Sequence, residues 1–158
     1  MLSFKRTKSD DLLKSQLFNE TTFYRFFFKD LKNAKTNVII ESPYLTERRA
    51  IQFSETLNSL KKRGIKIRVY TRLPSHHNKT LEIQAWKAVS VLRKSGVKVN
   101  LCSDLRHRKI AVIDDRIMWD GSLNILSQNR SCEIMRRTES AELSKQLLKF
   151  IGLRGRIW

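Results

Sequence analysis

The sequence contains few cysteines, prolines and glycines. Its 158 residues include two Cys, two Pro and five Gly. Cys102 and Cys132 are too few for the disulfide framework of a small secreted domain, and a chain of this length buries enough surface to fold without one. We therefore expect a reducing, cytoplasmic setting. The low proline and glycine content excludes collagen-like, linker-like and low-complexity segments.

Long apolar runs are also absent. No stretch approaches the roughly 20 apolar residues that cross a membrane, and residues 1–6 are not followed by the apolar core of a signal peptide. We expect a soluble protein without stable membrane association. The length suits one compact domain. We place this domain at residues 20–158, after a basic and partly helical N-terminal segment at residues 1–19.

Acidic residues are scarce relative to basic ones. The chain has 15 Asp and Glu against 32 Lys and Arg, which gives a formal net charge of +17. Such an excess repels itself, and a polyanion such as nucleic acid or an acidic membrane surface would relieve the repulsion. The alternative is a solvated basic surface that only keeps the protein soluble. The charge thus indicates a class of partner and no chemistry.

Hydrophobic spacing predicts alternating helices and strands. Apolar residues at helical spacing from residue 12 to 35 predict one helix or a pair, and the aromatic cluster at 23–28 fits a buried helix face better than a base-stacking platform. Short apolar or alternating runs predict strands. The strands fall at residues 37–41, 65–70 and 97–101, and the helices between them at about 47–63 and 80–94.

This order of elements predicts an α/β fold. Strands joined by crossover helices pair in parallel, so we expect a sheet that is covered by helices on its faces. The last third differs, because Asp114 and Asp115 form a turn between two strand-like runs and predict a hairpin. A short strand at residues 132–136 and a helix at 140–150, capped by Ser140, complete the prediction.

The residues that indicate chemistry flank this hairpin. His107 and Lys109 are two residues apart on an expected strand, so both side chains should leave the same face. The return strand ends in a flexible glycine, Gly121, followed by Ser122 and Asn124. Because a hairpin brings its open ends to one edge, these side chains should reach one small anion. An imidazole can attack phosphorus, while a cation and an amide stabilise charge on the phosphoryl oxygens.

The same residues resemble the signature of the phospholipase D superfamily. Every fixed position and spacing is matched over residues 107–124: His-x-Lys, four residues, Asp, six residues, Gly-Ser-x-Asn. The likeness covers roughly residues 20–140 and includes the segments at 42–46 and 62–69 and a glutamate, Glu133. The resemblance implies a mixed β-sheet flanked by helices on both faces and a metal-independent phosphodiesterase.

The resemblance also implies roles for single residues. In such enzymes a motif histidine attacks the phosphodiester and forms a covalent phosphohistidine, a second motif histidine protonates the leaving oxygen, and water releases the product. Neither a metal nor a cofactor is required. By this match His107 is the nucleophile or the acid, Lys109 and Asn124 bind the phosphoryl oxygens, and Ser122 is a lesser contact.

Two carboxylates receive different roles from the resemblance. Glu133 is expected to orient the imidazole, although Ser131, two residues earlier, stands where some relatives carry Asn. We expect Asp114 to hold the hairpin or a neighbouring cation and not to react.

The number of motifs predicts the assembly. The mechanism needs two histidines that face one phosphate, and the chain carries one signature. His76 and His77 have no Lys two residues on and no Gly-Ser-x-Asn after them, so neither is a second copy. We interpret both as exposed loop residues, with a substrate contact as the alternative. The resemblance to small single-motif bacterial endonucleases therefore implies a homodimer with one shared active site.

A basic run after residue 60 and further arginines around the motif favour a long polyanion that is held by its phosphates. We therefore expect a nuclease that acts on DNA, with RNA as the alternative substrate, alone or with a targeting or helicase/ATPase partner. The predicted substrate-binding residues are Lys61, Lys62, Arg63, Arg106, Arg108, Arg136 and Arg137.

Three alternatives use the same residues. Phospholipid hydrolysis or transfer would usually come with two motifs in a longer chain. A nucleic-acid-binding module could keep the fold and lack activity. A metal site is not favoured, because the sequence has neither Cys-x-x-Cys nor His-x-x-x-His spacing.

Overall fold

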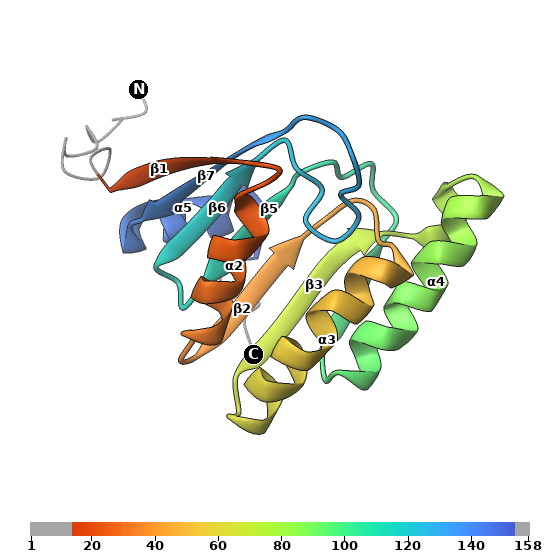
Figure 1. Ribbon diagram of the computed structural model, residues 1–158, viewed down its shortest axis with the longest axis horizontal. Coiled ribbons are helices and arrows are strands. Elements are labelled where there is room, and N and C mark those ends of the chain that lie inside the picture. The colour runs from red at the N-terminus through yellow and green to blue at the C-terminus, as the bar shows by residue number, and fades with distance from the viewer. Residues whose placement is uncertain (1–13, 154–158) are drawn as a thin grey trace.

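A mixed seven-stranded sheet runs through the structure, a computed structural model that describes residues 14–153 (Figure 1). In spatial order the strands are β1 (Ser15–Asn19), β7 (Ile134–Glu139), β6 (Ile117–Gly121), β5 (Ile110–Ile113), β2 (Asn37–Glu41), β3 (Lys66–Arg72) and β4 (Lys98–Cys102). The helices are α2 (Phe23–Lys32), α3 (Glu47–Lys62), α4 (Lys79–Lys94), α5 (Ala141–Phe150) and a short 3₁₀ helix, η1 (Pro74–His76).

The two halves of the sheet are built differently. β2, β3 and β4 are parallel and are joined through α3 and α4, whereas β5, β6, β7 and β1 each run antiparallel to their neighbours. Figure 1 shows α2, α3 and α4 on one face and α5 on the other. The predicted α/β fold with helices on both faces of a mixed sheet is confirmed. None of the helices within residues 14–153 is long and apolar enough to cross a membrane.

The larger part of the core lies between the sheet and α2, α3 and α4. Phe23, Phe27 and Leu31 of α2 are fully buried there. The indole of Trp119 on β6 meets the rings of Phe23 and Phe27 edge-on, with centroids 5.2 and 5.8 Å apart. The aromatic residues of this helix therefore serve mainly as core, as predicted. On the opposite face a smaller cluster that includes Leu148 packs α5 against β2 and β5.

Side-chain caps fix where three helices begin. Thr46, Asn78 and Ser140 accept hydrogen bonds from backbone N–H groups in the first turns of α3, α4 and α5, so the predicted Ser140 cap is confirmed. Gly64 and Gly96 follow α3 and α4 with φ of +75° and +84°. Glycine adopts this left-handed conformation without steric cost, which explains why the helices stop there.

The helix expected before residue 20 is wrong where the structure describes it. Ser15–Asn19 form strand β1, which pairs antiparallel with β7. Leu17, which suggested a helix face, is 70% exposed, whereas Phe18 is buried with its ring centroid 5.0 Å from that of Trp119. Pairing with β7 outweighs the weak helical spacing of so short a segment. The rest of the expected N-terminal segment, residues 1–13, lies outside the described residues.

The predicted hairpin is confirmed, and its turn is fastened to the start of β2. Asp114 and Asp115 have φ of +55° and +50°. The Asp114 carboxylate accepts hydrogen bonds from the backbone amides of Lys35, Thr36 and Asn37 at 2.8–3.2 Å and from the Thr36 hydroxyl at 2.9 Å. Burial alone would raise the pKa of Asp114, but the amide hydrogen bonds lower it below its ordinary value. Asp114 thus holds the hairpin, as expected.

Replacing Asp114 by Asn keeps the side-chain shape and the tolerance of a positive φ but removes the charge. We expect Asp114→Asn to lower the free energy of unfolding at pH 7 by about 2 kcal/mol, because hydrogen bonds to a charged acceptor are the stronger ones. The folded pKa lies below the unfolded one. The wild type should therefore lose this stabilisation as the pH falls from about 4 through the folded pKa, and the variant should show no such loss.

Denaturant unfolding at a series of pH values measures both effects. Asp115→Asn is the matched control, because it removes a charge from the adjacent turn position with a similar φ. An equal loss of stability in the control would contradict the role given to Asp114.

Candidate active site

The signature residues lie at one end of the sheet. Glu41 at the end of β2 pairs with Ile110 at the start of β5, so the segment that carries His107 and Lys109 lies beside the carboxyl ends of β2 and β3. β6 runs back antiparallel and ends at Gly121 near the same edge. Figure 1 shows the connections before β5 and after β6 together at this edge. The hairpin therefore brings its two open ends together, as predicted.

His107 and Lys109 are in direct contact. Lys109 Nζ lies 2.7 Å from Nδ1 and 3.2 Å from Nε2 of His107, and it donates a 2.8 Å hydrogen bond to the His107 carbonyl oxygen. His107 is exposed, whereas Lys109 is 9% exposed. Both residues precede β5, which begins at Ile110, and do not belong to the strand as expected. The two side chains nevertheless point the same way, as predicted, because the segment that carries them leads directly into β5.

Burial changes the titration of the lysine. It lowers the pKa of Lys109, and the nearby Glu133 carboxylate partly opposes this effect. An ammonium has only donors, so it can hydrogen-bond only to a ring nitrogen that accepts. The pair therefore presents an imidazole beside a fixed cation at an exposed edge.

The connection after β6 is held against the loop that follows β2. The Leu126 amide donates to the Ser42 hydroxyl at 3.2 Å, and the Thr46 amide donates to the Leu126 carbonyl at 2.9 Å. From the helical side, Tyr24 Oη donates to the Ile125 carbonyl at 2.9 Å. These contacts connect residues 42–46, which share the family resemblance, to the part of the motif that contains Asn124.

Tyr44 lies between the motif histidine and a second histidine. Its ring centroid is 6.1 Å from that of His107, edge-on, and 5.0 Å from that of His77. Asn124 lines the same pocket as Tyr44 and His77. His77 is half-buried, so the interpretation of both loop histidines as exposed holds for His76 and is wrong for His77. No sequence pattern indicates this contact, because Tyr44 and His77 come from separate loops.

Ser122 directly follows β6, and Glu133 directly precedes β7. The Ser122 amide donates to the Ile134 carbonyl at 2.9 Å, and the Ile134 amide donates back to the Ser122 hydroxyl at 3.1 Å. The Glu133 carboxylate accepts a 2.7 Å hydrogen bond from the Ser131 hydroxyl. Glu133 and His107 are both described, and the structure shows no hydrogen bond between them. The charge of Glu133 raises the pKa of Lys109, and the hydrogen bond from Ser131 holds the Glu133 carboxylate in place.

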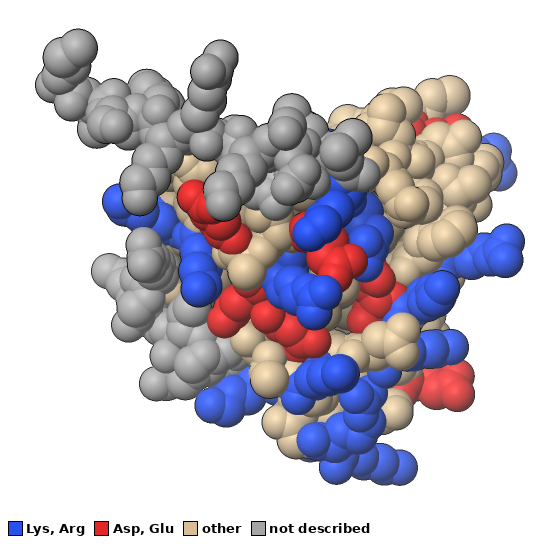
Figure 2. Space-filling view, turned by 90° about the vertical axis from the view of Figure 1, so that its left-hand side faces the viewer, with Lys and Arg blue, Asp and Glu red and all other residues tan. Residues whose placement is uncertain are grey.

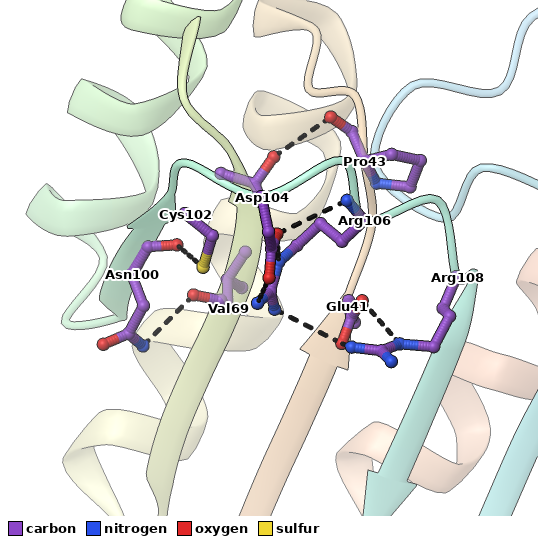
Figure 3. Close-up of polar contacts among 9 residues, drawn as sticks. Glu41, Pro43, Val69, Asn100, Cys102, Asp104, Arg106 and Arg108 are labelled. Atoms are coloured by element: carbon purple, nitrogen blue, oxygen red, sulfur yellow. Dashed lines mark hydrogen bonds and ion pairs between the residues drawn. The ribbon is translucent and has the colours of Figure 1, made fainter. Parts of the chain in front are cut away.

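A buried carboxylate that the sequence analysis missed lies beneath the His107 segment. Glu41 has no exposed surface. Its Oε1 accepts a 2.9 Å hydrogen bond from Arg108 Nε, and its Oε2 lies 3.5 Å from Arg106 Nη1. Figure 3 shows the two guanidinium groups meeting Glu41, with Asp104 also paired to Arg106 at 2.7 Å. An acidic residue closing an apolar strand was the available signal, because a buried carboxylate requires a cationic partner.

Arg106 and Arg108, predicted to bind substrate, therefore hold the segment in place. Alternate residues of an extended chain point to opposite sides. With Arg106 and Arg108 turned toward Glu41, the side chains of His107 and Lys109 leave on the other side. Both arginines are committed to carboxylates in the structure.

Of the other predicted substrate-binding residues, Arg136 lines a cavity together with Ser122 of the signature. Arg136 pairs with Asp120 at 2.8 Å and Arg137 with Asp30 at 2.7 Å. Figure 2 shows Lys and Arg interleaved with Asp and Glu on the face beside β1, β7 and β6. Lys61, Lys62 and Arg63 end α3, next to the start of β3 and so at the opposite end of the sheet from His107.

Within residues 14–153, no group of three or more His, Cys, Asp or Glu side chains is placed to hold a metal ion. Cys102 is half-buried and Cys132 is exposed, and both are free thiols.

Comparisons with known proteins agree with this geometry. The family model "Cardiolipin synthase, PLD-like domain" matches residues 27–152. No curated protein matches the chain. Among solved structures, NucT from Helicobacter pylori is similar over 87% of this chain and 92% of its own, with 24% identity and a TM-score of 0.70. Nuc from Salmonella typhimurium, a phospholipase D family member, is similar over 90% and 93%, with 17% identity and a TM-score of 0.73.

Phosphatidylserine synthase from Haemophilus influenzae shares the fold over 88% of this chain but only 38% of its own, with 14% identity and a TM-score of 0.65. The chain thus corresponds to the whole of the two small proteins and to part of the larger enzyme.

Removing the buried carboxylate should destabilise the fold. We expect Glu41→Ala to lower the free energy of unfolding by about 2 kcal/mol, because Arg108 loses its carboxylate partner and Arg106, at 12% exposure of its side chain, keeps only Asp104. Glu55→Ala, which removes an exposed carboxylate from α3, is the matched control and should change stability by no more than about 0.5 kcal/mol. Equal unfolding midpoints for the two variants in urea would contradict this account.

Proposed function

Because the chain belongs to the phospholipase D superfamily, we propose that it is a metal-independent nuclease that cleaves DNA in preference to RNA through a covalent phosphohistidine. The contact between the exposed His107 imidazole and the buried Lys109 ammonium carries the proposal. A nucleophile held 2.7 Å from a fixed cation is the arrangement that attack on an anionic phosphodiester requires.

The chemistry proceeds in two displacements. A ring nitrogen of His107 attacks phosphorus, a P–N bond forms, and the P–O bond to the leaving strand breaks. A second imidazole gives its proton to the leaving oxygen, and then takes a proton from the water that attacks phosphorus and breaks the P–N bond. Lys109 and Asn124 stabilise charge on the phosphoryl oxygens, and Glu133 supports the lysine.

A homodimer supplies the second imidazole. Each chain carries one signature, with one motif histidine, His107. In a dimer, His107 of the partner subunit would face it across a twofold axis. Leu17 on β1 and Ile134 on β7 are 70% and 56% exposed, and they line a shallow cavity of about 370 Å³ together with Ser122. An apolar surface beside the motif suits a second copy of this chain. NucT and Nuc, which match over nearly their whole length, are also small proteins of this fold.

Phosphatidyl transfer or hydrolysis is the second candidate. The matching family model is described as that of cardiolipin synthase, and one similar structure is a phosphatidylserine synthase. A net charge of +17 favours a polymeric polyanion over a single lipid phosphate.

The decisive assay is cleavage of DNA and RNA by purified protein in excess EDTA. We expect cleavage by the wild type, a loss of at least about 10³-fold in His107→Ala, and full activity in His76→Ala, which alters an exposed histidine outside the site. Retention of ³²P on the wild type after an alkaline denaturing quench, but not on His107→Ala, would support the covalent step. Cleavage only with added Mg²⁺, or release of headgroup from phosphatidyl vesicles instead of nucleic acid cleavage, would contradict the proposal.

Subunit mixing tests the shared site. If one site needs both copies of His107, a refolded equal mixture of wild type and His107→Ala should retain about one quarter of the activity of the same total of wild type, because only that share of dimers carries two histidines. Independent sites would leave about one half. Mixing with His76→Ala should leave the activity unchanged, and the mass in solution should be that of a dimer.

A further inference from the structure

A pocket beside the signature residues has a chemistry that the phosphodiester reaction does not use. It has a volume of about 240 Å³, and its walls include Tyr44, His77, Leu81 and Asn124. The pocket is continuous with the candidate active site, because Asn124 lines it and the ring of Tyr44 lies 6.1 Å from that of His107. Whatever occupies the pocket therefore lies next to the phosphate.

Two flat rings form one wall of this pocket. The centroids of Tyr44 and His77 are 5.0 Å apart, and their planes are tilted by 38°. The two residues come from the loops that follow β2 and β3, so the parallel pairing of these strands brings them together. Leu81, in the first turn of α4, adds an apolar contact. Aromatic and apolar walls of this kind bind a planar ring by stacking.

Two residues that line the pocket carry polar atoms without partners. Nε2 of His77 and Oδ1 of Asn124 are buried and have no hydrogen-bond partner in the described structure. A buried polar atom of this kind is costly unless a ligand or water satisfies it. Burial lowers the pKa of His77, with further contributions from Arg72 and His76, so the imidazole is neutral at pH 7. A neutral imidazole has one donor and one acceptor nitrogen, which suits the edge of a nucleobase.

We propose that this pocket binds the nucleobase that adjoins the scissile phosphate, stacked against Tyr44 and hydrogen-bonded to His77. The assignment rests on the proposed nuclease function, since a nucleic acid carries a planar ring with polar edges one sugar away from the phosphodiester. A base paired within a duplex cannot enter such a pocket without leaving the stack. The substrate is therefore single-stranded or locally unpaired nucleic acid.

The test compares two single-stranded oligonucleotides of the same length in EDTA. One carries a base on each side of a defined phosphate, and the other has abasic sugars at these two positions. The wild type should cut the base-bearing phosphate about 10-fold faster at low substrate concentration, which is the size expected for one stacked base. His77→Ala should lose most of this preference yet cut the abasic site as fast as the wild type. His77→Phe, which keeps a ring beside Tyr44, should lose less.

His76→Ala is the matched control, because it removes the adjacent, exposed imidazole and should keep the full preference. Thermal unfolding of each variant shows whether it is folded. Equal cutting of the two oligonucleotides by the wild type would overturn the pocket assignment while leaving the nuclease proposal intact. Cutting of duplex DNA as fast as of the single strand, or an undiminished preference in His77→Ala, would also overturn it.

A binding experiment separates this inference from the proposed activity. An oligonucleotide with 2-aminopurine at the pocket position is titrated with His107→Ala, and its fluorescence should be quenched by stacking on Tyr44. The quenching should disappear in the double variant with Tyr44→Ala. Quenching that persists in the double variant, or that a short-chain phospholipid abolishes and a nucleotide does not, would contradict a base-binding role even if no cleavage were detected.

Discussion

The arrangement of the site depends on a carboxylate that the sheet buries at one end. Glu41 closes β2 with no exposed surface, and an unpaired charge at that position would be strongly destabilising. Arg106 and Arg108 turn toward it and satisfy it. Residues 106–109 are extended, so their side chains alternate in direction. With Arg106 and Arg108 facing Glu41, His107 and Lys109 face the other side. The direction of the imidazole is thus determined by a charge pair that lies beneath it.

The β5 and β6 hairpin is fastened at both ends, and this gives the site a rigid frame. At the turn, Asp114 accepts hydrogen bonds from successive backbone amides at the start of β2. At the open end, Leu126 is bound to the loop after β2 through Ser42. A site that is built on fixed strands holds its groups more precisely than one on free loops. The number of residues between Lys109 and Ser122 is the length of this hairpin.

Charge is the property for which the sequence was the poorest guide. The excess of basic residues favours a polyanionic partner, yet Arg106, Arg108, Arg136 and Arg137, all predicted to bind substrate, each pair with a carboxylate. Glu41 and Asp30 are far in the sequence from the arginines with which they pair. Composition contains no information on such pairing. Net charge therefore describes the field of the protein, and only the folded chain shows which cations are paired with carboxylates.

The sequence by itself determined the α/β order of elements, the hairpin, the Ser140 cap and the shared direction of His107 and Lys109, because these follow from periodicity and from contacts between near neighbours. It did not determine β1, which exists through its pairing with β7, more than 100 residues away along the chain. Nor could it place Glu41 under the active segment or His77 beside Tyr44. These contacts join separate strands and loops, and their energies depend on burial and register, which only the tertiary structure decides.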